Sequence, residues 1–347
     1  MADRRGNGQL QELNWIRGVS ALFIVLYHYT YQYGVSIGHL TDWPVTVPWG
    51  CGAVNVFFLL TGFLTIYALK LGSSPVQFAW KRAKRLYPAY WICIVLTSVV
   101  MAILLPEYLR SLKEILMNLT MLQNFAGIRN VDGVYWTLSY ELIFYFYVAV
   151  LLIFKKATWR WVRNLSLVWI VVSFGYYALE KAGITNIAMT GARLILMPYF
   201  AAPFAGGVLL ATVAKERKRD LFSYGGVVIS IVLSILVQEL SYAILYCIAV
   251  ILLGVLVEKR FVVEDEGCVN RIEHISKYMR PLAFVASISY PLYLLHQFIG
   301  FAIIKHIEQL GLRSEIFIFI PIAIMLCIAF AVQKFVDRLM MLGKKRS

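Results

Sequence analysis

Residues 13–34 read LNWIRGVSALFIVLYHYTYQYG, a mostly apolar run of the length needed to cross a lipid bilayer. Arg17 lies near its start and His28 follows eleven residues later. An imidazole in hydrocarbon is costly, so a membrane histidine usually faces a cavity or a partner and marks a functional site. Eleven residues are about three helical turns plus 20°, which predicts both side chains on one face, about 16 Å apart.

The whole chain shares this apolar character. Of its 347 residues, 60% are hydrophobic and only 15% are charged, whereas soluble domains carry about a quarter charged residues. The long apolar runs lack the alternation of barrel strands. The predicted fold class is therefore all-α: one integral-membrane domain over residues 1–347, a polytopic bundle with no fused soluble domain. Ten transmembrane helices are predicted, at about 14–34, 49–70, 86–105, 133–154, 164–181, 193–213, 221–238, 241–257, 282–304 and 315–337.

The basic residues predict the orientation. If both termini are cytoplasmic, 26 of the 33 lysines and arginines fall on the inner side, as the positive-inside rule requires. These residues form short clusters between the apolar runs, so the net charge of +14 does not indicate nucleic-acid binding. The start of the chain has no short apolar region and no small-residue cleavage site, so no cleaved signal peptide is expected. We therefore expect a multi-pass protein of the plasma or inner membrane.

Three titratable groups from three predicted helices share one depth. His28, Glu141 and His296 each lie about 9–12 Å from the outer end of their helix. Convergence on a polar cavity would account for three costly groups in one layer. The alternative for each is a structural hydrogen bond or ion pair between helices. No metal-ligand spacing such as HExxH or CxxC is present, and no metal is expected.

A second cluster is predicted on the inner face. The loop expected after the second helix contains KRAKR at 81–85. Arginine forks suit phosphate oxygens, so Arg82 and Arg85, with Arg17, could hold a phosphorylated cytoplasmic ligand; the alternative is a plain positive-inside anchor. Arg193, at the outer start of the sixth predicted helix, is a candidate contact for an acidic glycan or lipid headgroup, or simply an interfacial arginine.

Together these segments resemble the integral-membrane acyltransferase family 3, the O-acyltransferases that modify surface polysaccharides and related glycans. The resemblance covers nearly the whole chain. It rests on five segments in the family's order: Arg17 with His28, FFLLTGF at 57–63, KRAKRLYPAYW at 81–91, VYWTLSYELIFY at 134–145 and SYPLYLLH at 289–296. Two positions depart from the family: Thr61 replaces a common serine, and Glu141 stands where two adjacent acidic residues are frequent.

The resemblance implies a donor, an acceptor and site residues. The donor would be cytoplasmic acyl-CoA, acetyl-CoA by the family's default, and the acceptor a hydroxyl of a cell-surface polysaccharide or glycolipid. The family's arginine and histidine correspond to Arg17 and His28, and its basic motif to Arg82 and Arg85. Its tryptophan, serine and glutamate correspond to Trp136, Ser139 and Glu141. Homo-oligomerisation is left open.

The expected mechanism centres on His28. It would act as the general base toward an acceptor hydroxyl, oriented by Glu141, or as a transient acyl carrier. Ser139 or Asn55 could stabilise the oxyanion, and His296 is a further candidate on the acceptor side. The competing interpretations are a transporter or permease, and a non-catalytic membrane partner in a glycan-assembly complex. No repeat symmetry of the kind common in transporters is evident in the sequence.

Overall fold

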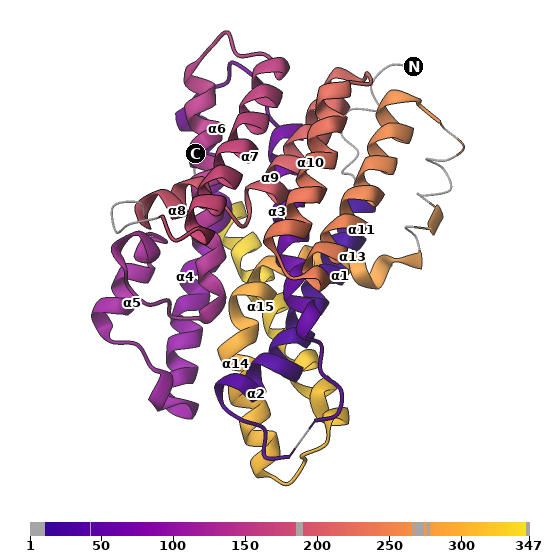
Figure 1. Cartoon of the computed structure of the whole chain (residues 1–347). Coiled ribbons are helices and arrows are strands. Elements are labelled where there is room, and N and C mark those ends of the chain that lie inside the picture. The colour runs from indigo at the N-terminus through magenta and orange to yellow at the C-terminus, as the bar shows by residue number, and fades with distance from the viewer. Residues whose placement is uncertain are drawn as a thin grey trace. The chain divides into compact units, whose positions relative to one another are not determined.

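The computed structural model describes residues 11–41, 43–184, 190–265, 267, 274–275 and 278–344. All regular secondary structure in these ranges is helical (Figure 1), which confirms the predicted all-α class. The chain divides into two compact units. Unit 1 comprises Met1–Ser20, Cys51–Phe78 and Ile143–Ala283, and unit 2 comprises Ala21–Gly50, Ala79–Leu142 and Phe284–Ser347.

Several helices are long and apolar enough to cross a membrane. Within the described residues there are seven, and a bent pair of helices makes an eighth if it is one span. The seven are Pro48–Tyr67, Pro75–Leu104, Gly133–Ile153, Trp159–Lys181, Gly191–Glu216, Leu240–Val262 and Ile316–Leu342. The bent pair is Arg280–Ser287 with Ser289–Gln309, and Leu221–Val237 is a shorter apolar helix. Transmembrane helices are thus established, while the total of ten spans and the cytoplasmic termini stay predictions.

Unit 1 is organised around two helices in close contact, α3 (Ala53–Tyr67) and α9 (Ala201–Glu216). A Cβ atom on Gly207 of α9 would lie 2.0 Å from the Leu59 carbonyl oxygen, and one on Gly62 of α3 would lie 2.2 Å from that of Phe204. Small residues let helix backbones approach this closely in a membrane. The helices α7 (Trp159–Lys181) and α10 (Leu221–Val237) pack on α9, and α11 (Leu240–Val257) packs on α3 (Figure 1). The short α8 (Thr190–Leu196) precedes α9.

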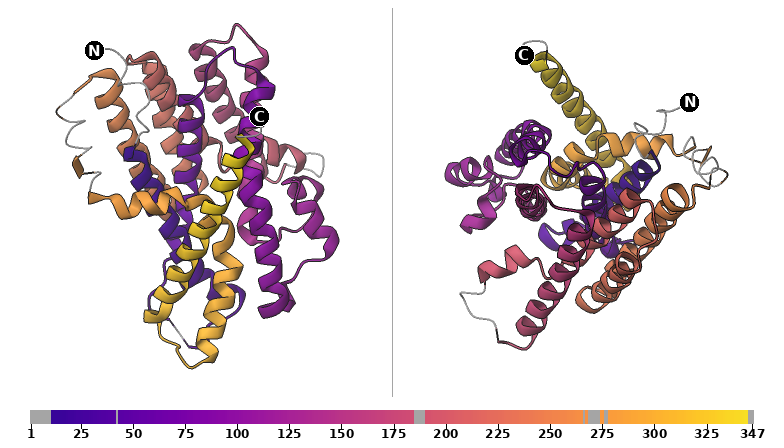
Figure 2. Two further views of the ribbon diagram at one scale, coloured as in Figure 1. Left: turned by 180° about the vertical axis from the view of Figure 1, so that it is seen from behind. Right: turned by 90° about the horizontal axis from the view of Figure 1, so that it is seen from above.

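Unit 2 contains the C-terminal helix pair. The helices α14 (Ser289–Gln309) and α15 (Phe319–Lys344) are joined by a short connection and lie side by side (Figure 2). The short helix α5 (Leu112–Asn118) lies in the segment that connects α4 (Pro75–Leu104) with α6 (Trp136–Ile153). The helices α4 and α6 each have residues in both units.

The basic segment at 81–85 lies within a helix and not in the loop that the sequence predicted. Helix α4 begins at Pro75, eleven residues before the predicted start at 86. Proline suits the first helical turn, and Ser74 caps it by accepting hydrogen bonds from the backbone of Gln77 at its hydroxyl and of Phe78 at its carbonyl. The helix has 30 residues and is about 45 Å long, so it exceeds the hydrocarbon thickness by several turns.

Two predicted helices are interrupted, each next to a proline. The range 282–304 is bent by 74° between α13 (Arg280–Ser287) and α14, because Pro291 lacks an N–H and its ring would clash with the carbonyl of Ser287 in a straight helix. The range 193–213 is broken between α8 and α9. There Met197 has φ +53°, and Pro198 disfavours the right-handed helical conformation for the residue before it.

Candidate active site

His28 begins a π-helical turn. The first helix runs as α1 (Gln11–Tyr27), continues as the π-helix η1 (His28–Gln32) and ends as α2 (Tyr33–Ser36). Single π turns inside α-helices are rare, and those that occur often lie at functional sites. The next residue, Tyr29, is fully buried, and its ring lies against Gly300 of α14, where a Cβ atom would be only 2.2 Å from the Tyr29 hydroxyl. The missing side chain at position 300 therefore lets the π turn lie directly on α14.

This packing brings His28 and His296 into contact. Nδ1 of His28 lies 3.1 Å from Nε2 of His296, and the ring centroids are 4.6 Å apart. Nδ1 of His296 lies 2.8 Å from the Tyr293 carbonyl oxygen and 3.2 Å from that of Leu292, so this nitrogen carries the proton and Nε2 accepts. Nδ1 of His28 lies 2.9 Å from the Ile24 carbonyl oxygen, so it too is the donor.

The contacts fix one tautomer for a neutral His28. Its Nδ1–H is shared between the Ile24 carbonyl and Nε2 of His296, which leaves the lone pair on Nε2 of His28. Among the described residues, no donor contacts that Nε2 atom. The side chain is half-buried, whereas His296 is fully buried. His28 thus presents a basic nitrogen, and His296 accepts a hydrogen bond from the other side of the same ring.

Sequence reasoning missed Asp132. Its carboxylate is fully buried and accepts hydrogen bonds from the backbone N–H of Val134, at 3.2 Å, and of Phe298, at 3.1 Å. The first bond caps the helical segment that leads into α6, and the second fixes α14 two residues after His296. In the sequence, Asp132 resembles an ordinary helix cap ahead of GVYW, and nothing in the local pattern announces the bond to residue 298.

We expect Asp132→Ala to loosen this part of the site. The substitution leaves two buried backbone donors without their acceptor, at a cost of about 1–3 kcal/mol each if no water replaces it. Both the midpoint of thermal unfolding in detergent and the rate of acyl transfer should fall, and Asp132→Asn, which keeps an acceptor oxygen, should recover part of both. Equal midpoints for the wild-type protein and Asp132→Ala would contradict this role.

A chain of side-chain amides leads to Ser139. Gln123 donates to Asn130 at 2.8 Å, Asn130 donates to Asn124 at 3.0 Å, and Asn124 donates to the Ser139 hydroxyl at 2.8 Å. Ser139 is buried, and since its oxygen accepts from Asn124, its own proton is directed elsewhere. Trp136 is half-buried three residues earlier and meets the Tyr140 ring edge-on at 5.6 Å. The residues named from the motif at 134–145 therefore line the first turns of α6.

Comparison with known proteins shows the family of this chain. A family model described as an acyltransferase domain matches residues 10–332. The chain belongs to this acyltransferase family. The match confirms the resemblance predicted from the five sequence segments.

Two curated relatives of the acyltransferase come from rhizobia. The chain is 26% identical over 279 residues to the "Exopolysaccharide production protein ExoZ" of Rhizobium meliloti (strain 1021), covering 76% of this chain and 81% of the relative. It is also 26% identical over 167 residues to "Nodulation protein 10" of Rhizobium leguminosarum bv. viciae, covering 41% of this chain and 45% of the relative. No solved structure matches the chain.

The predicted acyl-CoA-binding arginines and Glu141 lie on three different helices of the acyltransferase. Arg85 is exposed on α4, and Arg17, Arg82 and Glu141 are half-buried on α1, α4 and α6. The partner that contacts the His28 ring nitrogen is His296, and the orienting role of Glu141 stays a prediction.

Asn55 and Arg193 both lie in unit 1. The Asn55 amide exchanges hydrogen bonds with that of Gln238, so both of its polar atoms are used. Arg193 lies 3.5 Å from Glu180 and 5.3 Å from the Tyr199 ring centroid. No cluster of three or more metal-ligating side chains occurs in the described part of the acyltransferase.

Proposed function

We propose that the protein is a membrane O-acyltransferase that moves an acyl group, by expectation acetyl, from cytoplasmic acyl-CoA to a hydroxyl of a cell-surface glycan. The observation that carries the proposal is the pair of histidines. His28 is held through Nδ1 by the Ile24 carbonyl and His296, and its Nε2 keeps a lone pair for the substrate. A base oriented through its other ring nitrogen is the arrangement that acyl transfer to a hydroxyl requires.

The steps follow from this base. Nε2 of His28 takes the proton of the acceptor hydroxyl as its oxygen attacks the thioester carbonyl carbon. The tetrahedral intermediate collapses, the carbon–sulfur bond breaks, and the departing CoA thiolate takes the proton back from His28. His296 stabilises the transient imidazolium by accepting its Nδ1–H.

A second mechanism uses the same lone pair. Nε2 of His28 would attack the thioester carbonyl carbon and release CoA as its thiolate. The resulting acyl-imidazole would then pass its acyl group to the hydroxyl, whose proton goes to the thiolate, directly or through water. Both versions need the tautomer described above, and both end in the same ester.

The donor assignment rests on the basic residues of α4. In the predicted orientation the first turns of α4 project from the inner face, and there Arg82 and Arg85 would bind the phosphates of CoA. The flexible pantetheine arm would then carry the thioester to His28, while the charged nucleotide stays at the cytoplasmic surface. The acceptor assignment draws on the relative named for exopolysaccharide production.

Transfer of label tests the proposed function. Purified protein in nanodiscs is incubated with radiolabelled acetyl-CoA and glycan isolated from a strain that lacks the gene. We expect label in the glycan, and mass spectrometry of that strain's surface glycans should show the loss of an acyl ester. Uptake of an unmodified sugar into sealed liposomes would favour a permease instead. Transfer that occurs only after a second membrane protein is added would favour a non-catalytic partner.

A further inference from the structure

A cationic cavity lies in unit 2 beside α5. Its volume is about 760 Å³, and its charged lining residues are Arg110, Lys113, Arg129 and Glu114. These three cations are among the seven basic residues that the predicted orientation leaves on the outer side. Three positive charges against one negative charge make this cavity a candidate site for an anion.

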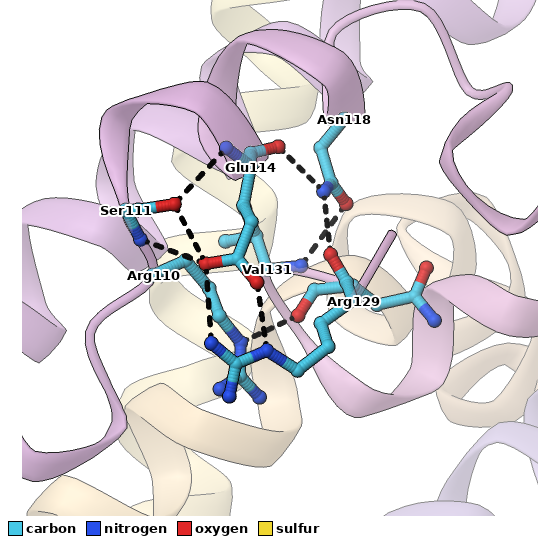
Figure 3. A network of polar contacts seen from close by, with 7 residues as sticks. Arg110, Ser111, Glu114, Asn118, Arg129 and Val131 are labelled. Atoms are coloured by element: carbon cyan, nitrogen blue, oxygen red, sulfur yellow. Dashed lines mark hydrogen bonds and ion pairs between the residues drawn. The ribbon is translucent and has the colours of Figure 1, made fainter. Parts of the chain in front are cut away.

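The single carboxylate of the cavity is already engaged (Figure 3). Glu114 accepts hydrogen bonds from Nε of Arg129 at 2.7 Å and from the backbone and hydroxyl of Ser111, both at 2.9 Å. Ser111 and Glu114 form a capping box at the start of α5. The hydrogen bonds from Arg129 and then from Ser111 lower the pKa of Glu114 to about 2. Glu114 is therefore bonded to Arg129, and no carboxylate of the cavity lining forms a hydrogen bond with Arg110.

Arg110 is an arginine of the cavity that no carboxylate of the lining contacts by a hydrogen bond. Its side chain is half-buried, and its Nε donates to the Asn130 carbonyl oxygen at 2.9 Å. Within the described ranges no acceptor contacts Nη1 or Nη2. Burial, and then the nearby charge of Arg129, lowers the pKa of Arg110, and the charges of Glu114 and Asp132 offset only part of this. A guanidinium that is partly desolvated and faces a like charge is stabilised when an anion binds between them.

The cavity is held together by Asn118. Its side chain donates to the carbonyl oxygens of Glu114, at 2.8 Å, and Arg129, at 2.9 Å, and accepts from the backbone of Val131 at 3.0 Å (Figure 3). Asn118 is fully buried, so these three bonds fix the 129–131 segment against α5. The two arginines are thus positioned before any ligand arrives, which lowers the entropy cost of binding.

The cavity is also connected to the candidate active site. The carbonyl of Asn130 anchors Arg110, and its side-chain amide belongs to the chain that ends on Ser139. The 129–131 segment leads directly into Asp132, which is bonded to α14 beside His296. An anion held at Arg110 would therefore lie on the segment that joins the cavity to α6 and α14.

We infer that this cavity binds a carboxylate or other anionic substituent of the acceptor glycan, so that the enzyme's substrate is an acidic glycan. That the bound anion is part of the acceptor rests on the proposed function. That the cavity binds an anion does not depend on it. A glycan is favoured over a lipid headgroup for two reasons. A chain of hydrogen bonds links the cavity to Ser139, and the side chains of Lys113 and Arg129 are exposed.

Binding without any acyl donor tests the inference. Affinities of tetragalacturonate and of neutral maltotetraose are measured for the whole protein in phosphatidylcholine nanodiscs. The acidic probe should bind at least about tenfold more tightly, Arg110→Gln should remove about tenfold of that affinity, and Arg110→Lys should retain part of it. The control is Arg217→Gln, which also removes one arginine charge but lies outside the cavity, where Arg217 is exposed and pairs with Glu264 at 3.0 Å. This control should bind as the wild type does.

The outcomes separate the two proposals. Equal affinities for both probes, or an Arg110→Gln protein that folds and binds like wild type, would overturn the acidic acceptor. A protein that binds phosphatidylglycerol through Arg110 but does not bind tetragalacturonate would also overturn it. The cavity would then be a site for lipid headgroups. Arg110-dependent binding of tetragalacturonate in a protein that never transfers acyl groups would support the anion site and refute the proposed enzyme.

Discussion

Replacing His28 with alanine is expected to lower the rate of acyl transfer by about 10²- to 10⁴-fold, the usual contribution of a positioned general base. The side chain that is lost is the one whose Nε2 carries the free lone pair. The rate is measured with radiolabelled acetyl-CoA under single-turnover conditions. His306→Ala is the control, because His306 is another histidine of unit 2 but is exposed on α14 away from the pair, and its rate should equal that of the wild type.

The wild-type protein distinguishes the general base from the acyl carrier. Without acceptor, an acyl carrier would accumulate acyl-His28, which mass spectrometry of a rapidly quenched sample would detect. A general base would leave His28 unmodified, and CoA would be released only when the glycan is added. If His28→Ala folds normally and transfers label as fast as the wild type, His28 has neither role.

Among glycine-to-alanine substitutions in unit 1, Gly207→Ala is expected to destabilise the fold most. The added Cβ would lie 2.0 Å from the Leu59 carbonyl oxygen, a separation that no relaxed structure tolerates, so α3 and α9 would have to move apart. We expect a loss of stability of about 3 kcal/mol or more, at or above the upper end of the usual cost of overpacking. Thermal unfolding followed by fluorescence-detected size exclusion would measure it.

The control is the same substitution at Gly225 of α10. Nothing lies within 4 Å of a Cβ at that position, and alanine favours the helix, so Gly225→Ala should unfold at the same temperature as the wild type or higher. Equal midpoints for Gly207→Ala and Gly225→Ala would show that the α3–α9 contact does not limit stability.

The sequence predicted the helices well because apolar length is a local property. What it missed were effects of single residues on neighbouring turns. Pro291 and Pro198 interrupt ranges whose composition is mostly apolar from end to end. The sequence predicts the start of α4 too late because the charges of KRAKR are typical of a loop, whereas Pro75 and Ser74 supply a helix start eleven residues earlier.

The candidate active site was only partly predictable. Depth alone suggested that His28 and His296 could meet, and the structure brings them into contact. Asp132 and Arg110 escaped notice because their importance depends on tertiary contacts: one with the backbone of residue 298, the other with the carbonyl of Asn130. Neither contact leaves a periodic trace in the sequence, since both partners are backbone atoms that any residue type could provide.

The π turn at His28 also has a consequence for the ancestry of the first helix. Such a turn accommodates one residue more than an α turn, so it is the expected outcome of a single-residue insertion into a regular helix. The α-helix continues to Tyr27, so the register between Arg17 and His28 is unaffected, and the extra residue is absorbed between His28 and Tyr33. A relative with a regular first helix would therefore have to be aligned with a one-residue gap after the histidine.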